Sequence, residues 1–160
     1  MLKTILSKDG EIKLTVDQML GKLARWIRLM GYDVYYPAGS IPDNEIIERS
    51  RSEGRIIITR DYGMYQKYPL SIFEPYDDID EQLRDFATHF SPKTRDRFMR
   101  CPVCNGRLVK LSTKVPPYVE NHRDIYMCTQ CHKIYWKGSH YRRIYKRIEK
   151  LGPKRRSDEQ

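Results

Sequence analysis

The sequence predicts an α/β fold followed by a small cysteine-centred domain, and three patterns carry that prediction. Short β-branched segments alternate with amphipathic helical segments over residues 12–90, as in parallel sheets whose crossovers are helices. Residues 1–90 hold 12 Lys+Arg and 15 Asp+Glu, whereas residues 91–160 hold 18 and 6. All four cysteines lie in that second part. The chain therefore divides into an acidic part of net charge −3 and a basic part of net charge +12.

The acidic part carries four expected strands and three longer helices. β-Branched and aromatic residues dominate four short segments, so strands are expected at residues 12–16, 33–36, 55–59 and 70–73. Apolar residues recur at helical spacing in three longer segments, so helices are expected at residues 18–30, 43–53 and 77–90. Residues 62–68 fit either a short helix or a loop. Three consecutive isoleucines, 56–58, favour a strand buried on both faces, and Asp43 suits the N-cap of its helix.

Acidic residues follow the ends of the expected strands. Asp17 follows the first strand, Asp61 follows the third, and Asp43 opens the helix after the second. Parallel sheets bind ligands beyond the carboxyl ends of their strands, and carboxylates gathered there repel one another unless a cation lies between them. Oxygen ligands of this kind suit Mg²⁺ or Mn²⁺. The three carboxylates therefore predict a divalent metal site that could activate water against a phosphodiester.

Structural roles compete with that interpretation. Asp17 and Asp43 could simply cap helices, and Asp61 could simply hold a turn. Glu45 is a weaker candidate, because the helix dipole alone favours a carboxylate in a first turn. The same helix-start role accounts for three further acidic residues, one of which could add a fourth metal contact: Asp77, Asp78 and Asp80.

The basic part is organised around two C-x-x-C pairs, CPVC and CTQC, with residues 105–127 between them. Four thiolates on two tight turns suit tetrahedral Zn²⁺ and leave no open coordination position. Disulfides and free core thiols are the alternatives, and disulfides fit poorly with a chain that shows no secretion signal. A segment this poor in large aliphatic residues needs a staple to fold. One structural zinc ion in a β-rich ribbon is therefore predicted, with the ligands Cys101, Cys104, Cys128 and Cys131.

Aromatic and basic residues interleave after the second cysteine pair, where they could stack on unpaired bases and meet phosphates. Cations beside the expected carboxylate site could also hold a phosphate backbone. The predicted RNA-binding residues are Lys22, Arg25, Arg60, Trp136, Lys137, His140, Arg142 and Arg143. The plain alternative is a last strand that packs Trp136 on the ribbon, followed by a solvated basic helix. Both interpretations are expected to hold in part.

Composition narrows the class of protein and its location. The formal net charge is +9, which makes nucleic acid the first partner to consider. No apolar run is long enough to span a membrane. The apolar stretch at the N-terminus is too short for a signal peptide. We therefore expect a cytoplasmic protein with no membrane partner.

Several motifs together resemble the Mut-seven C-terminal ribonuclease family. They span about residues 12–145 and are VDQMLGKLARWIRLMGYDV, PDNEII, RIIITRD, CPVC, CTQC and IYWKGSHYRR. The resemblance implies a PIN-like nuclease domain joined to a zinc ribbon, with Mg²⁺- or Mn²⁺-dependent endoribonuclease activity. It places the catalytic acids at Asp17, Asp43 and Asp61 and the zinc ligands at the four cysteines. PIN-like sites often hold a fourth acidic residue, and no position of this sequence matches one cleanly.

The expected organisation is a PIN-like nuclease domain at residues 1–95, a zinc ribbon with a basic C-terminal segment at 96–150, and a disordered tail at 151–160. The leading hypothesis is a metal-dependent endoribonuclease whose ribbon recruits RNA, with ribosomal RNA and tRNA among the candidates. The rival, from a different class, is an RNA- or ribosome-binding factor that uses the same fold without cleaving. A receiver-like phosphoryl-transfer domain is a third interpretation, which the attached basic ribbon disfavours.

Overall fold

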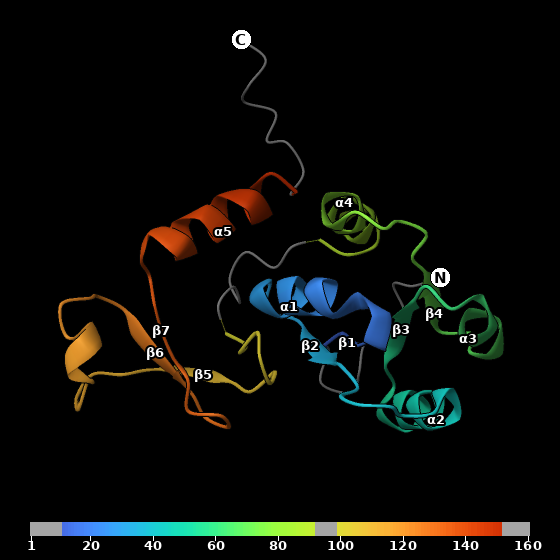
Figure 1. Cartoon of the computed structure of the whole chain (residues 1–160), viewed down its shortest axis with the longest axis horizontal. Helices are drawn as coiled ribbons and strands as arrows, with labels where there is room; N and C mark the ends of the chain where they lie inside the picture. The colour runs from blue at the N-terminus through green and yellow to red at the C-terminus, as the bar shows by residue number, and fades with distance from the viewer. Residues whose placement is uncertain (1–10, 92–98, 152–160) are drawn as a thin grey trace, which may run out of the picture.

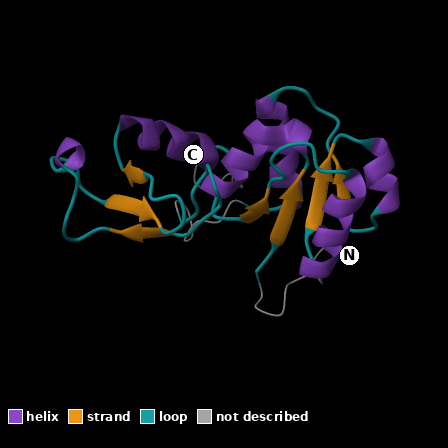
Figure 2. Cartoon of the chain, turned by 60° about the horizontal axis from the view of Figure 1, so that its bottom comes forward, coloured by secondary structure: helices purple, strands orange, loops and turns teal. Residues whose placement is uncertain are grey.

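The computed structural model describes residues 11–91 and 99–151. Two sheets organise these residues, one with four parallel strands and one with three antiparallel strands. Figure 1 shows the smaller sheet beside the larger one, with α5 (Ser139–Glu149) above the gap between them. Figure 2 shows helices on both faces of the larger sheet. The predicted class, a helix-flanked parallel sheet followed by a small β-rich cysteine domain and a basic helix, is confirmed.

All four predicted strands of the acidic part form. They are β1 (Lys13–Val16), β2 (Asp33–Tyr35), β3 (Ile56–Thr59) and β4 (Ser71–Phe73). Every neighbouring pair is parallel, and the order across the sheet is β2-β1-β3-β4. The chain therefore leaves β1 toward one side of the sheet and returns to its other side at β3. All four strands consequently point their carboxyl ends to one edge.

The helices divide between the two faces of that sheet. Their bounds are η2 (Gln18–Leu20, a 3₁₀ turn), α1 (Gly21–Leu29), α2 (Asp43–Glu53), α3 (Tyr62–Lys67) and α4 (Ile79–His89). Side chains of α1 and α4 share one apolar cluster with the sheet, whereas those of α2 and α3 share another. Residues 62–67 thus adopt the helical alternative. The N-cap expected at Asp43 was wrong, because Pro42 takes the N-cap position and Asp43 begins the helix itself.

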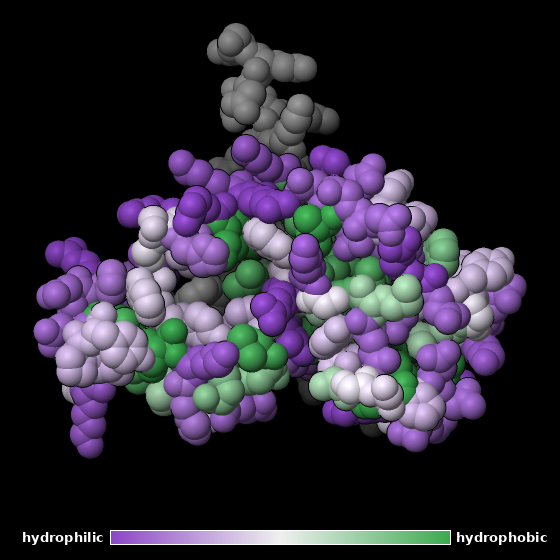
Figure 3. Space-filling view, viewed as in Figure 1, coloured by the Kyte–Doolittle hydropathy of each residue, from purple (hydrophilic) through white to green (hydrophobic). Residues whose placement is uncertain are grey.

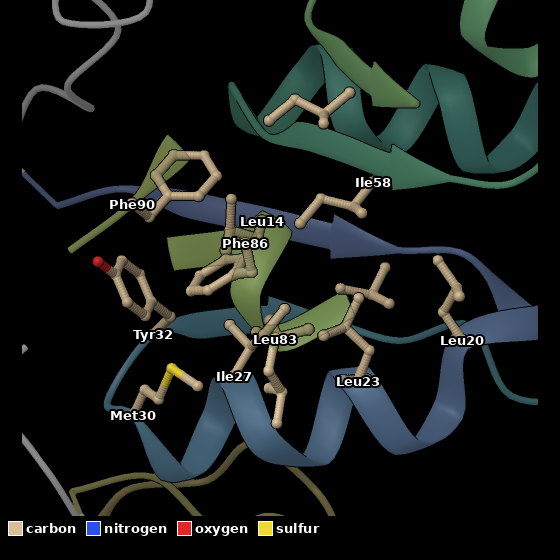
Figure 4. Close-up of a cluster of buried hydrophobic side chains, with 14 of the residues drawn as sticks. Leu14, Leu20, Leu23, Ile27, Met30, Tyr32, Ile58, Leu83, Phe86 and Phe90 are labelled. Carbon is tan, nitrogen blue, oxygen red and sulfur yellow. The ribbon is translucent and has the colours of Figure 1, made fainter. Parts of the chain in front are cut away.

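The main core lies between the sheet and helices α1 and α4 (Figure 4). Leu23 and Ile27 of α1 and Leu83 of α4 are completely buried in one cluster with residues of the sheet. The isoleucine strand behaves as predicted, since Ile56 and Ile58 belong to this core and Ile57 belongs to the cluster on the opposite face. Such burial on both faces is typical of a central parallel strand.

The cysteine-centred part is a three-stranded antiparallel sheet. Its elements are β5 (Leu108–Lys110), η3 (Pro117–Val119, a 3₁₀ turn), β6 (Ile125–Cys128) and β7 (Ile134–Trp136). β6 is central and pairs with both neighbours. The segment containing η3 lies between β5 and β6 and takes up the long interval between the two cysteine pairs.

The last described helix, α5, returns to the first domain. Ile148 is 2% exposed and belongs to the main core, and Ile144 and Leu151 pack against that core. The Arg147 guanidinium lies 4.9 Å from the ring centre of Trp26 on α1 and pairs with Asp80 on α4. The apolar stripe of α5 therefore docks on the parallel-sheet domain. The expected tail falls outside the described residues, apart from Leu151.

Candidate active site and metal centre

The carboxyl edge of the parallel sheet is the first candidate site. Asp17 directly follows β1, and Asp61 follows β3 by one residue. These two strands are neighbours, and the chain changes direction across the sheet between them. The crevice at such a switch point is the usual ligand site of an open α/β sheet. Asp17 and Asp61 thus lie where the strand order alone would place a functional group.

A hydrogen-bonded chain through Thr59 connects these two residues. The Thr59 hydroxyl donates to Asp17 Oδ2 at 2.8 Å, and the Asp61 backbone N–H donates to the same hydroxyl oxygen at 2.9 Å. Asp17 is 5% exposed, and its Oδ1 accepts from the Gln18 backbone at 2.7 Å. Asp61 is exposed, and its Oδ1 caps α3 by accepting from Met64 N–H at 2.9 Å. Both aspartates therefore cap a following turn while they face the same edge.

The loop that leads to Asp43 is tied to the same edge. The Tyr36 hydroxyl donates to the Gln18 carbonyl at 2.7 Å, and the Gln18 side chain donates to the Gly39 carbonyl. A Cβ at Gly21 would lie 3.0 Å from the Tyr36 hydroxyl, so glycine permits this close approach. Asp43 is exposed at the start of α2. The loop thus returns toward the residue that follows Asp17.

The three aspartates do not form a closed ligand set. Among residues 11–91 and 99–151, no three acidic or histidine side chains bring ligand atoms within 4.8 Å of one another. The donor chemistry nevertheless fits a hard divalent cation, since all three residues offer carboxylate oxygens. Asp17, Asp43 and Asp61 could hold Mg²⁺ or Mn²⁺ only if their oxygens moved closer together.

A further acidic residue at this edge, Glu74, has no counterpart in the sequence-based reasoning. Glu74 directly follows β4, its backbone N–H donates to the Thr59 carbonyl at 2.8 Å, and its side chain is 1% exposed. Burial raises the pKa of the Glu74 carboxyl to about 6. On the α4 side of the sheet, Glu74 lies close to Asp85 and His89. The available signal was its place after the fourth strand, the same rule that selected Asp17.

The four cysteines form the second candidate site, a metal centre. Their sulfur atoms all lie within 4.8 Å of one another, and none is disulfide-bonded. Cys101 Sγ lies 3.7 Å from Cys131 Sγ, and Cys104 Sγ lies 3.4 Å from Cys128 Sγ. Zn–S bonds of about 2.3 Å in a tetrahedron place sulfur atoms roughly 3.8 Å apart, which these distances approach. The cluster therefore fits the predicted zinc ion.

Local geometry also adapts the cysteine turns to a metal. A Cβ at Gly106 would lie 2.7 Å from Cys128 Sγ, so a side chain there would displace the sulfur. Backbone N–H groups of Gln130 and Cys131 donate to Cys128 Sγ, and that of Gly106 donates to Cys104 Sγ. Such N–H···S contacts favour thiolates over thiols.

The first cysteine turn docks on the edge strand β2 of the parallel sheet. The Asn105 side chain accepts from Val34 N–H at 2.9 Å and donates to Asp33 at 2.9 Å. The Arg28 guanidinium donates to the Val34 carbonyl at 2.9 Å and to the Pro102 and Val103 carbonyls at 3.2 and 3.1 Å. Polar groups of β2 that would otherwise remain unpaired at the sheet edge are thus satisfied across the junction.

Charges at that junction are paired. Burial alone would raise the pKa of Asp33, but hydrogen bonds from Asn105 and Arg55 bring it below its ordinary value. Burial lowers the pKa of Arg28, an effect that the sulfur atoms of Cys104 and Cys101 oppose. The buried guanidinium therefore lies in the field of the cysteine cluster as well as against its backbone.

The predicted RNA-binding residues separate into two groups. Lys22, Arg25, Trp136 and His140 line one pocket between α1, β7 and α5. Arg142 and Arg143 are exposed on α5, and Lys137 Nζ lies 4.0 Å from Asp124. Arg60 lies elsewhere, where its guanidinium pairs with Asp77. Any phosphate contact by Arg60 would compete with that ion pair.

A family model described as the Mut7-C RNAse domain matches residues 12–148 of the chain. The chain belongs to the Mut7-C RNAse domain family. Membership confirms the resemblance noted from the sequence, and it covers both the sheet domain and the cysteine domain. No curated protein and no solved structure matches the chain. In the part of the chain that the structure describes, no helix has the length and apolarity needed to cross a membrane.

Proposed function

We propose that this Mut7-C RNAse domain is a metal-dependent endoribonuclease that hydrolyses RNA phosphodiesters at the edge formed by Asp17, Asp43 and Asp61. The observation that carries the proposal is the hydrogen-bonded connection from Asp17 through Thr59 to Asp61 at the switch point of the sheet. Family membership supports RNA as the substrate.

The three carboxylates have two roles in this proposal. A bound Mg²⁺ or Mn²⁺ ion would activate water and stabilise the charge that develops on the phosphate. Asp17 is buried and held at both oxygens, so it would fix the position of the ion. Asp61 and Asp43 are exposed, so they would complete the site from the side that RNA approaches.

The cysteine domain has a recruiting role in the proposal. Four cysteine ligands would leave zinc without an open position, so zinc would stabilise the ribbon rather than react. The net charge of residues 91–160 is +12, and the exposed Arg142 and Arg143 belong to that segment. Positive charge attracts the phosphates of RNA whatever the base sequence.

A cleavage assay with Mg²⁺ or Mn²⁺ on single-stranded RNA tests the proposal. Asp61→Asn retains an oxygen that can cap α3 but loses the charge, so we expect cleavage to fall by about a hundredfold or more. Glu48→Gln is the matched control, because Glu48 is an exposed carboxylate on α2. Equal cleavage by wild type and Asp61→Asn would refute the assignment.

A second candidate function is an RNA-binding factor that does not cleave. The observation in its favour is that no three carboxylates of the described residues gather within 4.8 Å and that Asp17 and Asp61 both serve as caps. This candidate predicts salt-sensitive RNA binding that survives Asp61→Asn, with no cleavage by either protein. The same assay, read alongside binding, separates the two functions.

A further inference from the structure

A cavity of about 580 Å³ lies where the two domains and the last helix meet. Its lining comes from α1 on one side and from β7 and the start of α5 on the other. Figure 3 shows hydrophobic surface inside this region, with hydrophilic side chains around it. Ligand pockets in proteins commonly enclose about 300–1,000 Å³, so the cavity has room for a small aromatic group and its polar attachments.

Helix α1 presents a second, less deeply buried face to this cavity. Lys22, Trp26 and Leu29 recur at spacings of four and three residues, so they line one side of the helix, and Arg25 flanks them. The opposite face carries Leu23 and the rest of the apolar stripe that packs on the sheet. One face of α1 therefore lies wholly in the core, whereas Trp26 and Leu29 border the cavity while they also pack against that core.

The opposite wall is aromatic and ordered. Tyr135, Trp136 and Tyr141 line it. The Trp136 ring stacks on His122, with ring centres 5.1 Å apart and planes 19° apart. A Cβ at Gly138 would lie 3.0 Å from Trp136 Nε1, so the indole packs closely over the glycine. These contacts fix the indole before any ligand arrives, which lowers the entropic cost of stacking.

Cations border the cavity at its α1 side. Lys22 and Arg25 are exposed, and neither forms an ion pair with an acidic residue that the structure describes. Apolar and aromatic walls with unpaired cations at the mouth complement a ligand that has a flat ring and an adjacent anion. An unpaired nucleotide of RNA has that composition.

We propose that this cavity binds one unpaired base of an RNA strand, with the adjoining phosphates against Lys22 and Arg25. The inference rests on the proposed function in that RNA is the partner, but it does not depend on cleavage. Only the turn η2 separates Asp17 from α1, so the strand would continue from Lys22 toward the acidic edge. The pocket would thereby fix where the RNA lies relative to that edge.

The tryptophans of the chain provide a direct probe. The sequence contains two, Trp26 and Trp136, and both line the cavity. Single-stranded oligoadenylate and oligouridylate of ten nucleotides would be titrated into zinc-loaded Asp61→Asn protein, which keeps the RNA intact. We expect quenching of tryptophan emission by the single strands and little quenching by a duplex of equal length, because duplex bases are not free to enter. Trp26→Phe and Trp136→Phe, measured separately, assign the quenching to each wall.

Charge reversal tests the phosphate contacts. Lys22→Glu combined with Arg25→Glu alters only exposed side chains, and we expect it to weaken single-strand binding about tenfold or more. The slope of log affinity against log salt should fall by about 1.4, since each phosphate contact to a single strand contributes roughly 0.7. Arg51→Glu, on α2 at the opposite face of the sheet, is the matched control and should bind like the parent protein.

Three results would overturn the inference. If labelled RNA binds by fluorescence anisotropy while tryptophan emission stays constant, RNA binds elsewhere and the pocket proposal fails, although the proposed function stands. If Lys22→Glu/Arg25→Glu binds like Arg51→Glu, the phosphate contacts are wrong. If emission depends on protein concentration without RNA, a second copy fills the cavity instead. Absence of RNA binding in anisotropy would refute the proposed function itself.

Discussion

Arg28 connects the sheet domain to the first cysteine turn, and replacing it with Met tests that junction. Its guanidinium donates to the buried Val34 carbonyl and to the partly buried Pro102 and Val103 carbonyls. Met keeps the aliphatic bulk but leaves all three acceptors without their donor. A buried acceptor left unsatisfied costs about 1–3 kcal/mol, and each acceptor that water can reach costs about 0.5 kcal/mol. We expect the free energy of unfolding to fall by about 2–4 kcal/mol and the Tm by about 5–15 °C.

Thermal and urea unfolding of the zinc-loaded protein measure this loss, and a chelating dye measures the rate of zinc release. Release should quicken in Arg28→Met, because the lost positive charge lies near Cys101 and Cys104. Arg28→Lys should be intermediate, since one ammonium cannot reproduce the planar fork of a guanidinium. Arg84→Met removes an exposed arginine from α4 and is the control. Equal loss of stability in Arg28→Met and Arg84→Met would refute the reasoning.

Other positions yield three further predictions. Ile148→Ala should lower the free energy of unfolding by about 2–5 kcal/mol, because the Ile148 side chain belongs to the main core. Urea unfolding measures this loss, with Val109→Ala, which alters an exposed residue, as the control. Burial raises the pKa of Glu74 from 4.5 to about 6, so the folded state keeps a proton that the unfolded state releases across that interval, and stability falls as pH rises through it. The free energy of unfolding of Glu74→Gln should therefore rise by up to about 2 kcal/mol relative to that of wild type between pH 5 and pH 7.5. If the difference in unfolding free energy between the two proteins stays constant with pH, the burial argument is contradicted. Thr59→Val should lower the free energy of unfolding by about 1–2 kcal/mol and should lower the rate of RNA cleavage, and Thr59→Ser should restore both. Cleavage by Thr59→Val at the wild-type rate would show that the hydroxyl does not align Asp17.

Local patterns were sufficient for much of the fold. The isoleucines 56–58 predict a strand buried on both faces, and β3 forms there with that burial. Two C-x-x-C pairs predict four clustered sulfur atoms, and the cluster forms. Both inferences need only residue type and spacing. A buried strand and a pair of metal-ligating cysteines are each encoded by a few neighbouring residues.

Contacts between distant segments could not be inferred in the same way. Asn105 pairs with Val34 and Asp33 across the domain junction, and nothing near residue 105 indicates which strand edge it meets. In the sequence, Thr59 is an ordinary strand residue. Only the pairing of β1 with β3 brings its hydroxyl to Asp17. At Asp43 a local rule failed, because the adjacent Pro42 took the N-cap position with its extended backbone.

The return of α5 to the sheet domain has a consequence for the order in which this protein matures. Chains emerge from the ribosome N-terminus first, and domains generally fold in that order. The sheet and helices α1 and α4 can assemble early, but the core waits for Ile148, which follows the last cysteine by 17 positions in the printed sequence. Until then the surface that receives α5 is uncovered. Because Cys128 and Cys131 precede Ile148 in the chain, all four candidate metal ligands are available before the core of the sheet domain can close.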